Sequence, residues 1–195
     1  MLDHMRLIDE ALHGIWGAIR IILHDPNAFE EFNVSAEGFW RSFAAILPAA
    51  VLAWPLFLIS HQAATESALA AGSPLPEPGL IRDYGQLLLL FVTWPIAAAL
   101  LARQFGVDKN YARYMIADNW MSVPAIVLTL ASELPFLMGV DQGFLTSLPT
   151  LLVFVGLVYV SWYVALRGLE TKGVIAATFV GVQLVLNFGL SWIVG

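Results

Sequence analysis

The sequence predicts an all-α membrane protein, a polytopic bundle of five transmembrane helices with an amphipathic helix ahead of them. Of the 195 residues, 59% are hydrophobic and only 12% are charged, whereas a soluble domain carries about 25% charged residues. Five apolar stretches follow the N-terminal segment, and each holds the roughly 20 residues that span a hydrocarbon core of about 30 Å. A water-soluble fold of this size cannot bury this much apolar surface, whereas the lipid of a bilayer can cover it.

The first domain, residues 1–34, is predicted to be a cytoplasmic or interfacial amphipathic segment. Its apolar residues recur every three or four positions, the period of one helix face. Pro26 ends this helix, because the residue before a proline disfavours the α conformation. Asp9 and Glu10 interrupt the apolar pattern, so we expect no cleaved signal peptide. Two arrangements stay open: the helix lies on the membrane surface, or it packs on a partner or on loops of its own chain. The recurring apolar residues are Leu2, Met5, Ile8, Leu12, Ile15, Trp16, Ile19, Ile22 and Leu23.

The second domain, residues 35–195, is predicted to hold the five membrane spans. Ser35 is a plausible N-cap for the first of them. The connection over 61–79 is rich in proline and glycine and is predicted to be a loop, and the connection over 138–146 is predicted to be a short turn. The predicted spans cover about residues 38–60, 80–102, 114–137, 147–166 and 173–194.

The basic residues predict an orientation for these spans. Eight of the nine lysines and arginines fall on one side of the predicted bundle, and only Arg82 falls on the other. Cytoplasmic loops of membrane proteins carry the excess of lysine and arginine. We therefore expect a multi-pass protein of a bacterial-type inner (plasma) membrane, with the N-terminus in the cytoplasm and the C-terminus outside. The eight residues are Arg6, Arg20, Arg41, Arg103, Lys109, Arg113, Arg167 and Lys172.

Two carboxylates in the third span, Asp118 and Glu133, are the candidate intramembrane ionisable residues, since a charge inside lipid is costly. They stand about 22 Å apart along one helix, too far for a paired-carboxylate site. Asp118 is either a proton or ion ligand facing the bundle interior, or a shallow carboxylate that pairs with Arg113 or reaches cytoplasmic water. Glu133 is expected near the outer interface. Arg82 and Asp83 are expected to mark the lipid–water boundary, or to pair with each other or with Glu133.

The last span has the clearest pattern. Gly173, Ala177 and Gly181 form a stripe of small residues, a spacing that allows close helix approach, and Gln183 and Asn187 continue it as a polar stripe. We expect this stripe to pack on the small residues Ala45, Ala49 and Ala53 of the first span. The polar stripe then either supports bundle packing alone or lines a substrate pocket. The opposite face, expected to meet lipid, holds Ile175, Phe179, Val182, Leu186 and Leu190.

Recognisable reaction chemistry is lacking in the sequence. It contains no cysteine, no HExxH or GxSxG motif, and no glycine-rich phosphate loop. Its four histidines fall outside the predicted spans, so an intramembrane haem would lack ligands. The acidic net charge of -6 does not suit nucleic-acid binding. We therefore expect a protein that is not an enzyme, binds no cofactor or metal, and has no nucleic-acid partner.

Several features together resemble the Yip family of small five-span membrane proteins. They are the segment Leu23–Phe29 (LHDPNAF) before the first span, a proline-bearing third span, and Trp162 ahead of a short basic turn and a small-residue last helix. Eukaryotic members carry a D-L-Y-G-P-like segment before the first span, for which the nearest counterpart here is Asp83-Tyr84-Gly85-Gln86, without the proline. The resemblance implies a non-enzymatic membrane organiser or partner-binding protein and assigns no site residues.

Taken together, these features predict a non-catalytic membrane protein in contact with the lipid bilayer. The leading expectation is a partner-binding, assembly or accessory subunit of a membrane complex, with a membrane-protein partner or a second copy of the chain. The alternative is a small transporter or channel component with a polar site at Asp118, Gln183 and Asn187.

Overall fold

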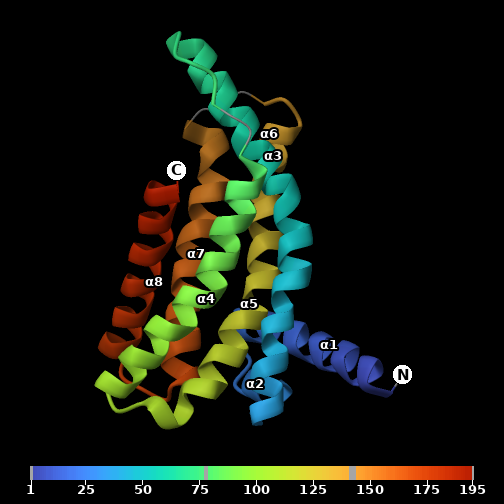
Figure 1. The fold of residues 1–195 in the computed structure, drawn as a ribbon, viewed down its shortest axis with the longest axis vertical. Coiled ribbons are helices and arrows are strands. Elements are labelled where there is room, and N and C mark those ends of the chain that lie inside the picture. The colour runs from blue at the N-terminus through green and yellow to red at the C-terminus, as the bar shows by residue number, and fades with distance from the viewer. Residues whose placement is uncertain (1, 77–78, 141–143, 195) are drawn as a thin grey trace.

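A computed structural model describes residues 2–76, 79–140 and 144–194, and all regular structure in these ranges is helical. This confirms the predicted all-α class (Figure 1). The elements in chain order are α1 (Leu2–Ile22), η1 (Ala28–Glu31), α2 (Ala36–Ser42), η2 (Phe43–Ala45), α3 (Ile46–Ala71), α4 (Leu80–Gln104), η3 (Asp108–Asn110), α5 (Tyr111–Ser132), α6 (Leu134–Leu137), α7 (Phe144–Gly168) and α8 (Gly173–Val194).

The predicted membrane spans correspond to long apolar helices. Within the described ranges, five helical stretches are long and apolar enough to cross a membrane, and α1 is not among them. The chain is therefore a multi-pass membrane protein. Figure 1 shows the spans running along the long axis, while α1 lies across them near one end and projects to the side, and α3 projects beyond the others at the opposite end. The stretches are Ala36–Ala71, Leu80–Gln104, Asp108–Ser132, Ser147–Gly168 and Gly173–Trp192.

The first span is longer than predicted. Its helix continues through residues 61–71 and ends at Gly72, whose φ of 62° is the left-handed conformation common after a helix. The predicted loop over 61–79 is therefore wrong for residues 61–71. Several alanines in this segment favour a helix strongly, so the helix persists where the sequence turns polar. His61 lies in this helix, and residues 77–78 of the predicted loop fall outside the described ranges.

The third span is shorter than predicted. α5 ends at Ser132, and the short helix α6 begins at Leu134 after a break at Glu133. Pro135 has no N–H with which to continue the α-helical hydrogen bonds, which explains the break. The predicted turn over 138–146 cannot be compared in full, because residues 141–143 lie outside the described ranges.

The core of the bundle is built around α5. Among the described spans, the third, which contains α5, is the most enclosed by the rest of the chain. Half of its most apolar segment is buried, against 17–28% of the corresponding segments of the other spans. α5 packs against α1 at one end and against α3 and α7 along its length. The spans around it keep large apolar side chains on their outer faces, which suits contact with lipid. The buried side chains that α5 contributes include Tyr114, Met115, Ile116, Ala117, Trp120 and Met121.

The N-terminal helix α1 docks against this core through a face of small residues. Gly14 lies directly against the indole ring of Trp120, and Ala18 beside it is fully buried. The sequence left open whether this helix lies on the membrane surface or packs against protein. The structure shows that it packs against its own chain. The opposite face of α1 is an exposed apolar stripe of Ile8, Leu12, Trp16 and Leu23, so contact with the membrane surface stays a prediction.

Ion pairs hold α1 to the segment that leads into the first span. Arg20 Nε donates to Asp25 Oδ2 at 2.8 Å, and a second nitrogen of Arg20 binds Glu31. Arg41 of α2 contacts Glu10 of α1 at 3.2 Å. The Arg20 hydrogen bond lowers the pKa of the Asp25 carboxyl below its usual range. The Arg20 pairs brace the N-terminal segment internally, and the Arg41–Glu10 pair ties α1 to the helix that leads into the first span.

The expected packing of the first span on the last is wrong. α3 packs mainly against α5 and α4, whereas α8 packs against α7 and α4. The faces of α8 are also the reverse of the prediction, because Phe179 is fully buried while Ala177 and Gly181 are exposed. The ring centroid of Phe179 lies 5.5 Å from that of Tyr114 and 6.4 Å from that of Trp94. The large ring of Phe179 fills the space between α8, α4 and α5. A small residue at this position would leave that space empty.

Gly14 and Gly181 both lie in helices, but replacing each with alanine should have opposite effects on the stability of the fold. A Cβ at Gly14 would lie 2.6 Å from the Trp120 ring, and such overpacking typically costs about 1–3 kcal/mol. A Cβ at Gly181 meets no atom of the described chain within 4 Å, and alanine favours a helix by up to about 1 kcal/mol over glycine. Thermal unfolding of the purified protein in detergent should show a lower Tm for G14A and an unchanged or higher Tm for G181A. Equal stability of the two variants would contradict the proposed docking of α1 on α5.

Candidate functional site

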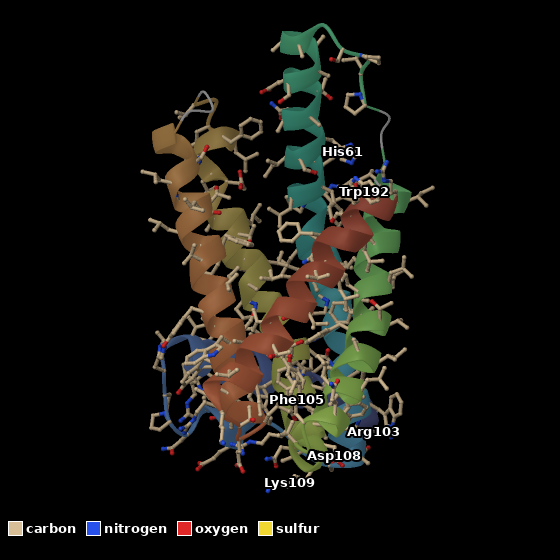
Figure 2. All side chains as sticks on the ribbon, turned by 90° about the vertical axis from the view of Figure 1, so that its left-hand side faces the viewer. His61, Arg103, Phe105, Asp108, Lys109 and Trp192 are labelled. Carbon is tan, nitrogen blue, oxygen red and sulfur yellow. The ribbon has the colours of Figure 1, made fainter. Side chains whose placement is uncertain are left out.

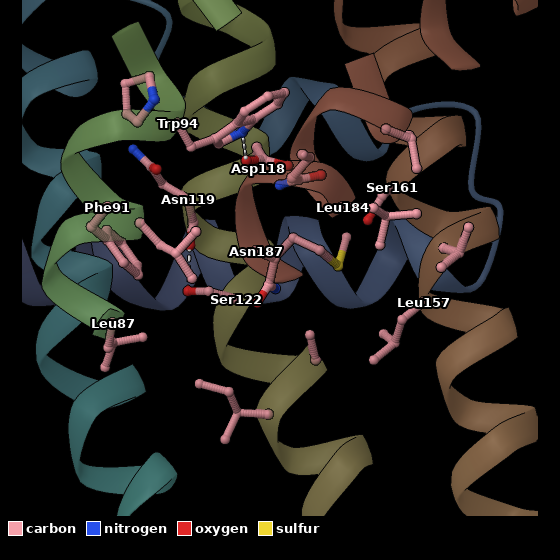
Figure 3. Close-up of a pocket in the computed structure, with 18 of the residues that line it drawn as sticks. Leu87, Phe91, Trp94, Asp118, Asn119, Ser122, Leu157, Ser161, Leu184 and Asn187 are labelled. Atoms are coloured by element: carbon pink, nitrogen blue, oxygen red, sulfur yellow. Dashed lines mark hydrogen bonds between the residues drawn. The ribbon is translucent and has the colours of Figure 1, made fainter. Parts of the chain in front are cut away.

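A cavity of about 360 Å³ lies between α4, α5, α7 and α8, within the membrane-spanning part of the chain (Figure 3). Most of its wall is apolar, as ligand pockets usually are, and a few polar side chains point into it. The apolar wall includes Leu87, Phe91, Trp94, Leu157 and Leu184. The polar side chains are Asp118, Asn119, Ser122, Ser161, Gln183 and Asn187.

Asp118 of α5 is the ionisable group of this cavity. Its Oδ2 accepts a hydrogen bond of 2.8 Å from Nε1 of Trp94, which α4 contributes (Figure 3). The predicted pairing of Asp118 with Arg113 is wrong, since Arg113 binds Glu170 and places its guanidinium 4.8 Å from the centre of the Phe29 ring. The carboxylate therefore faces the interior of the bundle, as the first of the two interpretations had it.

α8 contributes two amide side chains to the same cavity. Gln183 lies beside Asp118, and Asn187 follows one turn later on the same helix face. The structure thus brings together the three residues of the predicted polar site, which come from α5 and α8. Ser161 of α7 adds a hydroxyl to the wall of the cavity. A carboxylate, two amides and a hydroxyl give the cavity both hydrogen-bond acceptors and donors.

The small residues of the predicted stripe are not part of this cavity. Gly173 lies against the Trp162 indole, whose Nε1 donates to the Gly173 carbonyl oxygen at 2.9 Å. Ala177 and Gly181 face away from the bundle. The polar and the small residues of α8, predicted as one continuous stripe, are therefore divided between the cavity and the outer surface.

A buried hydrogen-bond chain fixes one wall of the cavity. Nδ2 of Asn119 donates to Oγ of Ser42 at 2.9 Å, and Ser42 Oγ donates to the Phe39 carbonyl oxygen at 2.7 Å. Ser122 Oγ donates to the Asn119 carbonyl oxygen at 2.6 Å. The chain connects α2 to α5. Among the described side chains, every fully buried polar atom has a hydrogen-bond partner.

The other candidate carboxylate, Glu133, borders a second cavity of about 510 Å³ at the C-terminal end of α5. Its Oε1 accepts a hydrogen bond of 3.1 Å from Thr150 Oγ1 of α7. The predicted pairing of Asp83 with Arg82 or Glu133 is replaced by a contact with His61 of α3, with Nε2 and Oδ2 2.7 Å apart. Asp118 thus lies within α5, whereas Glu133 lies at the break that follows this helix.

The charged residues that line the Asp118 cavity limit the kind of ligand that it can bind favourably. Its described lining holds one carboxylate and neither lysine, arginine nor histidine. Among the residues that the structure describes, no cluster of three or more histidines, aspartates and glutamates is suited to a metal ion. The arrangement therefore favours a positively charged or hydrogen-bond-donating ligand with an apolar part.

Trp94, Asn119 and Ser161 were not predicted as site residues. A signal for Trp94 exists in the sequence, because an indole N–H placed deep in a span needs an acceptor. Asn119 stands next to Asp118 and has the same need for a partner. For Ser161 the sequence carries no comparable signal, since a lone serine in a helix can bind a carbonyl of its own preceding turn.

No protein-family model, curated protein or solved structure matches this chain.

Proposed function

We propose that this chain is a non-catalytic membrane protein that binds a small organic cation in the Asp118 cavity, as a carrier or channel component. The observation that supports the proposal best is the meeting of Asp118, Gln183 and Asn187 in one cavity between four membrane-spanning helices. Ionisable groups are rare in such a place because lipid does not solvate them. A cationic ligand is a counter-ion for this carboxylate.

The shape and chemistry of the wall favour an organic cation over a bare metal ion. A metal ion needs several oxygen ligands around it, and Asp118 is the sole carboxylate in the described lining. The rings of Phe91 and Trp94 also line the cavity, and aromatic faces attract quaternary ammonium groups. The remaining apolar wall suits a hydrocarbon body. Gln183 and Asn187 supply hydrogen bonds that orient such a ligand.

The purified protein in detergent should bind benzyltrimethylammonium, a small quaternary ammonium with an aromatic body, and should not bind its neutral isostere neopentylbenzene equally well. Replacing Asp118 with asparagine keeps the shape and removes the charge, so D118N should weaken binding at least about tenfold, the equivalent of about 1.4 kcal/mol. Isothermal titration calorimetry measures both affinities.

The matched control is D83N, which removes a carboxylate that contacts His61 outside the cavity. D83N should bind benzyltrimethylammonium as the native chain does. Failure of the native chain to bind the cation, or equal affinity in D118N, would remove the basis for an organic-cation site.

We propose as a second candidate that the chain is a partner-binding or accessory subunit of a membrane complex, as its resemblance to the Yip family implies. The specific observation is the outer face of α8, where Ala177 and Gly181 are exposed and a Cβ added at Gly181 would meet no described atom of another helix within 4 Å. Small residues four apart allow another helix to approach closely. The occupant of this face is either a helix of a different protein or the same face of a second copy.

Affinity purification of the native chain in mild detergent should then retain a second membrane protein or a dimer, identified by mass spectrometry. G181L should lose it, because the larger side chain blocks close approach. The control is G156L on α7, where the glycine is also exposed with no described atom near its Cα. A native chain that purifies as a lone monomer would rule out this second function.

We propose further that the chain lies in a bacterial-type inner membrane with its N-terminus in the cytoplasm. Arg103 and Lys109 gather at the end of the bundle that α1 crosses, while His61 and Trp192 lie toward the other end (Figure 2). The positive-inside rule supports this orientation.

Because the native chain has no cysteine, single cysteines report this orientation cleanly. A cysteine at Ser73, in the exposed connection after α3, should react with a membrane-impermeant maleimide added to intact cells. A cysteine at Lys109 should react only after the cells are permeabilised. The reverse pattern would invert the proposed orientation.

A further inference from the structure

The Asp118 cavity and the Glu133 cavity adjoin each other end to end. Phe154 of α7 lines both of them. On α8, Asn187 lines the Asp118 cavity and the next residue, Phe188, lines the Glu133 cavity. The two cavities therefore follow one another along the same helices, with the Phe154 ring at their junction.

The course of α8 leaves this region open toward the outer end. Near its start α8 is bound to α7 through the Trp162–Gly173 hydrogen bond. Near its end it is bound to α4 through a hydrogen bond between Gln86 and Ser191. Figure 2 shows α8 crossing from the lower part of α7 toward the upper part of α4. The outer halves of α7 and α8 thus diverge, and the Glu133 cavity lies where they separate.

Both cavities carry the same sign of charge. Asp118 is the ionisable residue of one described lining and Glu133 of the other, and neither lining contains lysine, arginine or histidine. Two carboxylates about 22 Å apart along the chain's third span, one within α5 and one at the break after it, make a route that attracts cations and repels anions. Within a low-dielectric surrounding this discrimination is stronger than in water.

We propose that the Glu133 cavity is the outer entrance to the Asp118 site, that Phe154 is the movable barrier between them, and that cations enter by this route. The proposal rests on the proposed function and adds the direction of access and two residues that control it. The Phe154 side chain is 45% exposed in the chain taken alone, so packing does not lock its ring against the junction. Glu133 is held by Thr150 at the helix break, where it meets an arriving ligand first.

Because the native chain has no cysteine, the proposal can be tested by chemical modification of a single introduced cysteine. S161C places a single thiol in the Asp118 cavity. Intact cells are treated with either of two membrane-impermeant reagents, the cationic 2-(trimethylammonium)ethyl methanethiosulfonate or the anionic 2-sulfonatoethyl methanethiosulfonate. The reference is S73C on the exposed connection, which normalises the intrinsic reactivity of the two reagents. The rate of thiol modification is measured in each case.

After normalisation, S161C should react with the cationic reagent at least about tenfold faster than with the anionic one, because the route is lined by carboxylates. Adding F154A should increase the rate several-fold and F154W should decrease it, since these changes open or close the junction. E133Q in the S161C chain should reduce the preference for the cation without blocking access. G181C, which faces lipid, should react with neither reagent.

Modification of S161C from the cytoplasmic side alone, equal normalised rates for the two reagents, or rates that do not change with residue 154 would each overturn the proposed entrance. These outcomes leave the binding of benzyltrimethylammonium to the purified protein unaffected, because detergent exposes both ends of the chain. Loss of binding in that measurement would instead contradict the Asp118 site itself.

Discussion

The constraint on which the rest of the structure depends is the burial of α5 within the other helices. A helix surrounded by protein can carry polar groups that a lipid-facing helix cannot, because neighbouring helices supply their partners. Asp118 and Asn119 meet this condition, since Trp94 of α4 and Ser42 of α2 bind them. α1 closes one end of α5 by placing Gly14 against Trp120. The helices that pack most on α5, namely α1, α3 and α7, take their positions from the side of it that each covers.

The candidate site forms where this covering is incomplete. α7 packs closely on α5, whereas α8 reaches α4 and α7 and leaves space between itself and α5. Phe179 fills the part of that space nearest the crossing helix α1, and the shorter polar side chains beyond it leave the cavity open. Gln183 therefore lies beside the carboxylate of Asp118, and Asn187 lines the cavity one turn further along α8. The cavity within the membrane-spanning part of the chain thus results from one helix, α8, that is offset from the central one.

The two proposed functions use different faces of α8 and do not exclude each other. The inner face bears the amides that line the cavity, and the outer face bears Ala177 and Gly181, which leave room for another helix. A partner bound on the outer face would change the tilt of α8. The width of the opening beside Phe154 would change with it.

Hydropathy, charge and residue spacing in the sequence by themselves determined the membrane class, the five spans and the amphipathic first helix, because these depend on apolar content and helical period. They also singled out Asp118, Gln183 and Asn187, since polar groups in a span are conspicuous. The tertiary structure alone decided the faces of α8, the partner of Asp118 and the neighbours of α3. In a bilayer, lipid and protein interior are equally apolar, so hydrophobicity does not distinguish an outward side chain from an inward one. That choice depends on shape and on hydrogen-bond partners, and both come from residues distant in the sequence.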